Sequence, residues 1–111
     1  MQIVRSEISP RATALRLEGR LNMVAAPRLR AALDDVVAGG ANRVVVDLSG
    51  VSFMDSSGLG ALIAGLRVTR QAGGDLRIAG AGEQVATVLK LTNMDRVLKP
   101  YETAEAAADA W

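Results

Sequence analysis

The sequence predicts a single α/β domain in which helices pack on a mixed β-sheet. Two alternating segments open the chain, and segments with helical and strand spacing then follow one another in turn. Half of the 111 residues are apolar, and a chain of this length supports one packed core. We therefore expect one domain over residues 1–111, with four to five strands, about four helices and right-handed crossovers.

The first two strands are predicted over residues 3–8 and 12–17, where apolar and polar side chains alternate loosely. Residues 9–11, which include Pro10, separate them as a turn. The two strands should therefore form an antiparallel pair, and Gly19 is expected to end the second one.

A helix is predicted to start at Pro27, because proline suits the first helical turn, where its missing N–H group costs little. Apolar residues follow at helical spacing until Gly39 and Gly40 stop the helix. Residues 44–48 then form an apolar run without alternation. Such a run predicts a strand that is covered on both faces.

The second half continues the alternation of helix and strand. A helix is predicted over about residues 57–71, a short strand over 76–79 and a third helix over 85–92. A further short strand is expected next, before Thr103 caps an alanine-rich helix that ends at Trp111.

Composition excludes several classes of function. The 13 basic and 12 acidic residues are scattered and leave a net charge of +1, so we expect neither a nucleic-acid partner nor a membrane anchor. The chain has no Cys and no His, which removes the thiolate nucleophile, the usual general base and the commonest metal ligands. We expect no metal and no cofactor. Without a signal segment or a membrane span, the protein is expected to be cytoplasmic.

The most informative segment is residues 53–60, Phe-Met-Asp-Ser-Ser-Gly-Leu-Gly, between a predicted strand and a predicted helix. The start of a helix presents free backbone N–H groups and a positive dipole end. A carboxylate, Asp55, and two hydroxyls, Ser56 and Ser57, lie at that point, followed by Gly58. The segment could form a catalytic site, an anion cradle or a switch.

A nucleophilic role for Ser56 or Ser57 is disfavoured, because the spacing is not Gly-x-Ser-x-Gly and no His is present. A phosphate cradle at Gly58 and Gly60 lacks both the third glycine of dinucleotide-binding loops and the Gly-Lys of the Walker loop. Simple helix capping explains one residue of this segment. It does not explain the full Asp-Ser-Ser-Gly run.

Residues 53–60 resemble the signature of the bacterial anti-sigma factor antagonists, which are small STAS domains. The strand at 44–48, the Gly-Arg-Leu-Asn run at 19–22, the helix start at 26–27 and the glycines at 73–74 lie where this family has their equivalents. The resemblance covers nearly the whole chain. It implies that the chain is a single STAS domain.

The resemblance implies a regulator and not an enzyme. In the unphosphorylated form, such a protein binds an anti-sigma factor that is also a serine kinase with a histidine-kinase-like ATP-binding fold. Binding frees the sigma factor, phosphorylation abolishes binding, and a PP2C-type phosphatase resets the protein. The family's phosphorylated residue corresponds to Ser56. Asn22 stands where the family usually has an Asp, which makes the site less acidic.

A partner surface is expected around the phosphorylation site and along the second predicted helix. Small residues on that helix form a shallow face on which a partner could approach closely; alternatively, they fit beneath a neighbouring helix. Met54 offers a flexible apolar contact, although a lone methionine is more often part of a core. The predicted partner-binding residues are Asn22, Met54, Asp55, Ser57, Gly58, Ala61, Ala64 and Gly65.

Two other functions remain open at this point. The first keeps the fold and makes the chain a non-switching STAS subunit of a transporter or of a lipid-trafficking ATPase assembly. The second is a small-ligand or nucleotide binder, which a thermal shift with GTP or anionic ligands would reveal. A weak homodimer is also left open.

Overall fold

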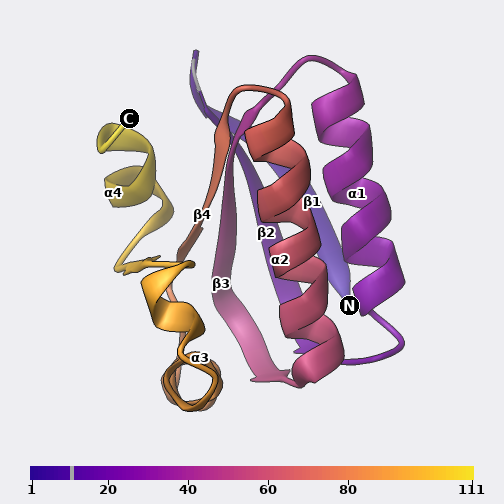
Figure 1. Cartoon of the computed structure of the whole chain (residues 1–111), viewed down its shortest axis with the longest axis vertical. Coiled ribbons are helices and arrows are strands. Elements are labelled where there is room, and N and C mark those ends of the chain that lie inside the picture. The colour runs from indigo at the N-terminus through magenta and orange to yellow at the C-terminus, as the bar shows by residue number, and fades with distance from the viewer. Residues whose placement is uncertain (11) are drawn as a thin grey trace.

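The computed structural model describes residues 1–10 and 12–111 of the chain (Figure 1). The predicted turn at 9–11 includes residue 11, which lies outside the described residues. The strands are β1 (Gln2–Ser9), β2 (Ala12–Leu21), β3 (Arg43–Met54), β4 (Asp75–Ala79) and β5 (Pro100–Tyr101). The helices are α1 (Ala26–Ala38), α2 (Ser56–Gln71), α3 (Glu83–Leu91), the 3₁₀ turn η1 (Met94–Arg96) and α4 (Ala104–Asp109).

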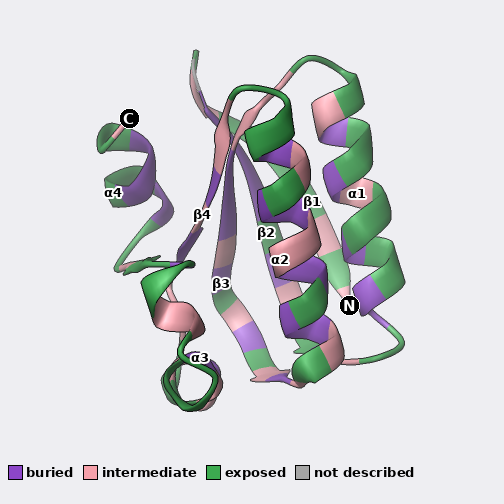
Figure 2. Cartoon of the chain, in the orientation of Figure 1, coloured by how far each residue is buried: buried purple, intermediate pink, exposed green. Residues whose placement is uncertain are grey.

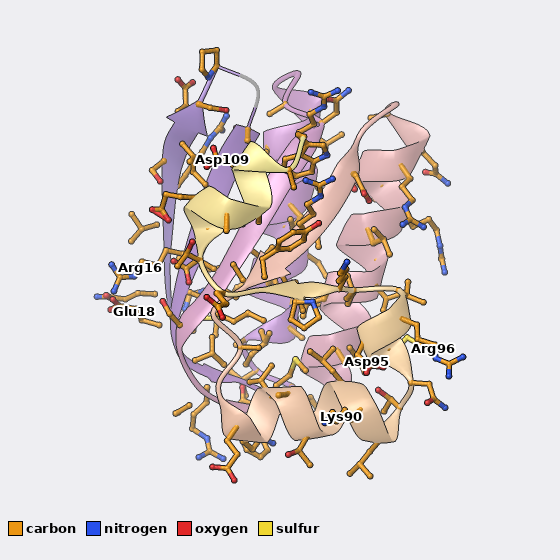
Figure 3. All side chains as sticks on the ribbon, turned by 90° about the vertical axis from the view of Figure 1, so that its left-hand side faces the viewer. Arg16, Glu18, Lys90, Asp95, Arg96 and Asp109 are labelled. Carbon is orange, nitrogen blue, oxygen red and sulfur yellow. The ribbon has the colours of Figure 1, made fainter. Side chains whose placement is uncertain are left out.

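The strands form one mixed sheet in the order β1-β2-β3-β4-β5. β1 pairs antiparallel with β2, whereas the remaining neighbours pair in parallel. Helices α1 and α2 lie side by side on one face of the sheet, and α3 and α4 lie on the other, as the two views show (Figures 1 and 3). The predicted α/β class and mixed sheet are confirmed.

The core follows from the apolar runs of the sequence. Val44, Val45 and Val46 are fully buried, which confirms that this part of β3 is covered on both faces. Buried residues line the inner sides of α1 and α2, whereas their outer sides are exposed (Figure 2). Burying one Leu or Val side chain contributes about 1.5–3 kcal/mol, so this layer holds the helices on the sheet. Among the described residues, no helix is long and apolar enough to cross a membrane.

Two predicted strand ends were wrong. β2 does not end at Gly19 but continues to Leu21, because Gly19 adopts a φ of +113° at a shift in the pairing register with β3. Glycine tolerates this conformation, so the strand bulges and goes on. β3 likewise runs beyond residue 48 to Met54, since β2 continues to pair with it as far as Leu21.

Candidate functional site

Helix α2 begins directly at the end of β3, with Asp55 as the only residue between them. Asp55 has an extended backbone, and its Oδ1 accepts a hydrogen bond from the N–H of Gly58 at 2.9 Å. Its own N–H donates to the carbonyl of Leu21 at 3.3 Å, and its carbonyl accepts from Leu59. Asp55 is therefore an N-cap that joins α2 to the end of β2.

The cap gives a first prediction about stability. We expect Asp55→Ala to lower the free energy of unfolding by about 1 kcal/mol, because the N–H of Gly58 loses its acceptor. Asp55→Asn keeps an acceptor oxygen and serves as the matched control, with a small effect. Urea unfolding measures both; equal losses in the two variants would show that charge, and not capping, is what Asp55 supplies.

Ser56 and Ser57 are the first two residues of α2. Ser56 is exposed, whereas Ser57 is half-buried. The backbone N–H groups of a first helical turn have no partner within the helix, and the positive end of the helix dipole lies there. Gly58 already donates to Asp55, so the N–H groups of Ser56 and Ser57 remain beside the two hydroxyls. This end of α2 can therefore tolerate a negative group.

Gly58 allows α2 to approach the end of β2. A Cβ atom on Gly58 would lie 2.3 Å from the carbonyl oxygen of Leu21 and 2.7 Å from its Cγ. Gly60 differs, because a Cβ atom there would have nothing within 4 Å. The first glycine of the motif is thus required by packing, and the second is not.

Asn22 follows Leu21 and organises the neighbouring loop. Its Oδ1 accepts hydrogen bonds from the N–H groups of Val24 and Ala25, both at 3.1 Å, and its carbonyl accepts from Ala26 at 2.9 Å. Asn22 therefore fixes the conformation of the loop that leads from β2 into α1. An Asp at this position would keep the same acceptor oxygen and would add a negative charge.

Gln84 of α3 is a site residue that the sequence did not reveal. Its Oε1 accepts from the N–H of Met54 at 2.8 Å, and its Nε2 donates to the carbonyl of Met54 at 3.0 Å. The side-chain amide thus holds the end of β3 as a neighbouring strand would. No local sequence signal marks a glutamine for this role, since its partner lies 30 residues away.

The prediction that Met54 contacts a partner was wrong, because its side chain is fully buried in the core. The strand extends to this residue, and its side chain belongs to the main core cluster together with those of Leu21 and Leu59. Met23 and Val24, in the loop after β2, are instead 71% and 78% exposed. A surface for apolar contact therefore exists near the start of α2, but other residues provide it.

The small residues of α2 divide between two roles. Ala61 and Gly65 are buried, and a Cβ atom on Gly65 would lie 2.5 Å from Cδ1 of Leu33 on α1. Gly65 therefore fits beneath the neighbouring helix, which was one of the two expected alternatives, so the prediction that it contacts a partner was wrong. Ala61 is also buried, but it borders the surface groove between α1 and α2. Ala64 is half-buried and remains at the surface.

A shallow groove of about 790 Å³ runs between α1 and α2 from the start of α2. Met23 and Ser57 both line it, so the groove extends to the residue next to Ser56, the predicted phosphorylation site. Apolar and small residues share its surface with two arginines and one aspartate. Its lining comprises Met23, Ala26, Pro27, Arg30, Ala31, Asp34, Ser57, Gly60, Ala61, Ile63, Ala64 and Arg67.

With this geometry in view, comparisons with known proteins identify the family. The STAS domain family model matches residues 4–107. The chain belongs to the STAS domain family. The resemblance seen in residues 53–60 is thereby confirmed, and it extends over nearly the whole chain, as predicted.

Several relatives of this STAS domain carry names that concern sigma factor regulation. It is 34% identical over 76 residues to a candidate anti-sigma factor antagonist of Thermotoga maritima, covering 68% of this chain and 67% of the relative. It is 26% identical over 91 residues to the anti-sigma-B factor antagonist of Staphylococcus aureus, covering 82% and 84%. The crystal structure of an anti-sigma factor antagonist from Mycobacterium paratuberculosis superposes with a TM-score of 0.87 at 28% identity, covering 98% and 92%.

An exposed hydroxyl and a capping carboxylate determine what this site can do chemically. Ser56 presents a hydroxyl, and Asp55 is already engaged as a cap. Among the described residues, no group of His, Cys, Asp and Glu side chains could hold a metal ion. The arrangement can receive a phosphoryl group and can present an apolar surface beside it.

Proposed function

We propose that this STAS domain is an anti-sigma factor antagonist whose binding is switched off by phosphorylation of Ser56. The observation that carries the proposal is the exposed Ser56 hydroxyl at the first position of α2, next to Ser57, which shares the groove between α1 and α2 with the exposed Met23. The partner is an anti-sigma factor that is also a serine kinase with a histidine-kinase-like ATP-binding fold. A PP2C-type phosphatase removes the phosphate, and the cycle runs in the cytoplasm.

Exposure favours Ser56 over Ser57 as the acceptor. A kinase must bring the γ-phosphate of ATP in line with the hydroxyl oxygen, which requires open space around it. Ser56 is exposed, whereas Ser57 is half-buried and lines the groove between α1 and α2. Ser57 therefore belongs to the docking surface in this proposal.

The fold can accept the phosphate without rearrangement. Phosphorylation adds about −1.5 to −2 charges and three acceptor oxygens. The N–H groups and the dipole at the start of α2 favour a negative group at this position. A partner whose carboxylate faces Ser56 experiences repulsion instead. The phosphate thus changes binding through charge at the surface.

The groove between α1 and α2, together with Met23 and Val24, is the proposed docking surface. We expect Met23→Asp to weaken binding of the anti-sigma factor about tenfold or more, because it places a charge in an apolar contact. Leu91→Asp is the matched control, since Leu91 is 80% exposed on α3 and lies outside this surface. Calorimetric titration measures both; equal weakening by the two variants would remove the groove from the interface.

Labelling tests the acceptor directly. We expect the cognate kinase with ATP to add one phosphoryl group to the wild-type protein and to Ser57→Ala, and none to Ser56→Ala. Intact-mass spectrometry provides the readout, and thermal unfolding confirms that each variant is folded. A labelled Ser56→Ala protein would move the acceptor to Ser57. An unlabelled wild-type protein that still binds its partner would favour a non-switching STAS subunit.

A further inference from the structure

The outer edge of β1 is open to a second strand. β1 lies at one end of the sheet, and only its inner edge pairs with β2. The strand spans eight residues, Gln2–Ser9, and contains no proline and no lysine. Edge strands are usually protected by such residues, because their free N–H and C=O groups bind other strands. The pairing of β1 with β2 is regular from Gln2 to Glu7 and shifts between Glu7 and Ser9, so the regular part of this edge is long enough to pair.

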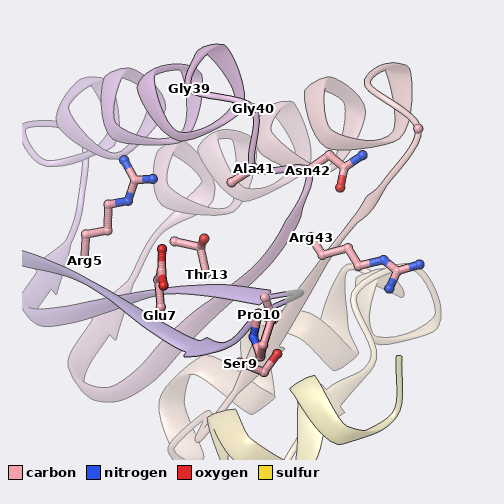
Figure 4. A pocket seen from close by; sticks show the side chains of 12 residues that line it. Arg5, Glu7, Ser9, Pro10, Thr13, Gly39, Gly40, Ala41, Asn42 and Arg43 are labelled. Atoms are coloured by element: carbon pink, nitrogen blue, oxygen red, sulfur yellow. The ribbon is translucent and has the colours of Figure 1, made fainter.

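Arg5 and Glu7 place opposite charges along this edge. They are two residues apart, so their side chains lie on the same face of β1. Figure 4 shows both side chains rising on one side of the strand, toward a hollow beside Gly39 and Gly40. Both residues are exposed. Within the described part of the chain, neither forms an ion pair.

We propose that two copies of this chain pair through the outer edges of β1, antiparallel, with the two-fold axis at Ser6. In this register Arg5 of each copy lies opposite Glu7 of the other, so the symmetry creates two ion pairs. No other antiparallel register of β1 with itself brings these two residues opposite each other. The positions of Arg5 and Glu7 therefore favour a second copy of this chain as the strand that pairs with β1, and they fix the register of the pair.

The same register pairs apolar residues on the other face of the strand. Val4 is 53% exposed, although it is a large apolar residue within a strand. Pairing about Ser6 places Val4 beside Ile8 of the second copy, which lies where the pairing of β1 with β2 shifts and which packs beside α4. Val4 would thus gain apolar contacts that it lacks in the single chain.

The face of the sheet that carries α1 leaves space for the second copy. The start of α1 lies near the first residues of the chain, where Nη1 of Arg28 donates to the carbonyl of Met1 at 2.7 Å. In an antiparallel pair, this end of one copy lies beside the last residues of β1 in the other. A hollow of about 590 Å³, lined by Arg5, Glu7 and Ser9 among others, is open there (Figure 4).

Charge exchange tests the register. In sedimentation velocity at rising concentration, we expect wild type to dimerise and Arg5→Glu and Glu7→Arg each to weaken dimerisation about tenfold or more. The double variant Arg5→Glu/Glu7→Arg should recover the dimer, because both pairs are again opposite in charge. Lys90→Glu, on α3, changes the net charge by the same amount as Arg5→Glu and should have no effect (Figure 3). A monomeric wild type, unaffected single variants, or a double variant no better than the singles would overturn the proposal.

Cross-linking tests the axis independently of affinity. The chain has no cysteine, so a single Ser6→Cys reports one contact. Directly opposed residues in an antiparallel pair have Cα atoms about 4.5–5.5 Å apart, within disulfide range. In Gln2→Cys, the control, the two residues would lie roughly 27 Å apart at about 3.4 Å per residue. We expect mild oxidation to dimerise Ser6→Cys alone; equal or absent cross-linking would contradict this pairing.

Neither the sedimentation nor the cross-linking experiment uses the anti-sigma factor, so their outcomes are separate from that of the phosphorylation switch.

Discussion

We expect Ser56→Glu to lower the affinity for the anti-sigma factor by at least about a hundredfold. Ser56 is exposed at the first position of α2, so the new carboxylate lies at the proposed interface. Like charges at an interface cost several kcal/mol, and each ~1.4 kcal/mol corresponds to a tenfold change in affinity. Calorimetric titration of the two proteins with the same anti-sigma factor measures the change.

The same substitution should leave the fold intact or slightly stabilise it. A negative side chain in the first turn of a helix interacts favourably with the helix dipole, by about 0.3–1 kcal/mol. Ser56→Gln is the matched control, because it has the same size without the charge. We expect it to bind much more tightly than Ser56→Glu. If the two variants bind equally weakly, steric exclusion and not charge explains the loss.

We expect Gly58→Ala to lower the free energy of unfolding by about 2 kcal/mol. The added methyl group would lie 2.3 Å from the carbonyl oxygen of Leu21, and neither backbone segment can move without disturbing the cap at Asp55. Overpacking of this kind costs about 1–3 kcal/mol, which exceeds the helix propensity gained by replacing glycine.

Gly60→Ala provides the control with the opposite sign. Nothing lies within 4 Å of a Cβ atom at Gly60, and the residue is exposed. Alanine in place of glycine within a helix should therefore raise stability by about 0.5–1 kcal/mol. Urea unfolding compares the two variants. A Gly58→Ala protein as stable as Gly60→Ala would show that α2 can shift away from Leu21.

Local patterns were sufficient for most of the fold. Glycines and proline marked helix ends, and the apolar run at 44–48 correctly indicated a doubly covered strand. A helix cap within residues 53–60 was recognisable, because capping depends on residues within one turn of each other, and the structure assigns it to Asp55. These features depend on neighbours in the sequence, and for that reason the sequence could reveal them.

The remaining features depend on distant residues. Gly19 was expected to end a strand, but pairing with β3 carries β2 past it. Met54 was placed at the surface and is buried, whereas Met23 is exposed, and only the packing of the sheet distinguishes them. Gln84 reaches Met54 from a different helix, which no local pattern indicates. The prediction thus described the local elements around residues 53–60 but not the surface that surrounds them.

Binding of the anti-sigma factor to unmodified and Ser56-phosphorylated protein is the most direct comparison. The phosphorylated form is prepared with the kinase, verified by intact mass, and titrated in parallel with the unmodified form. We expect tight binding by the unmodified protein and no measurable heat with the phosphorylated one, at equal thermal stability. Equal affinity of the two forms would contradict the switch.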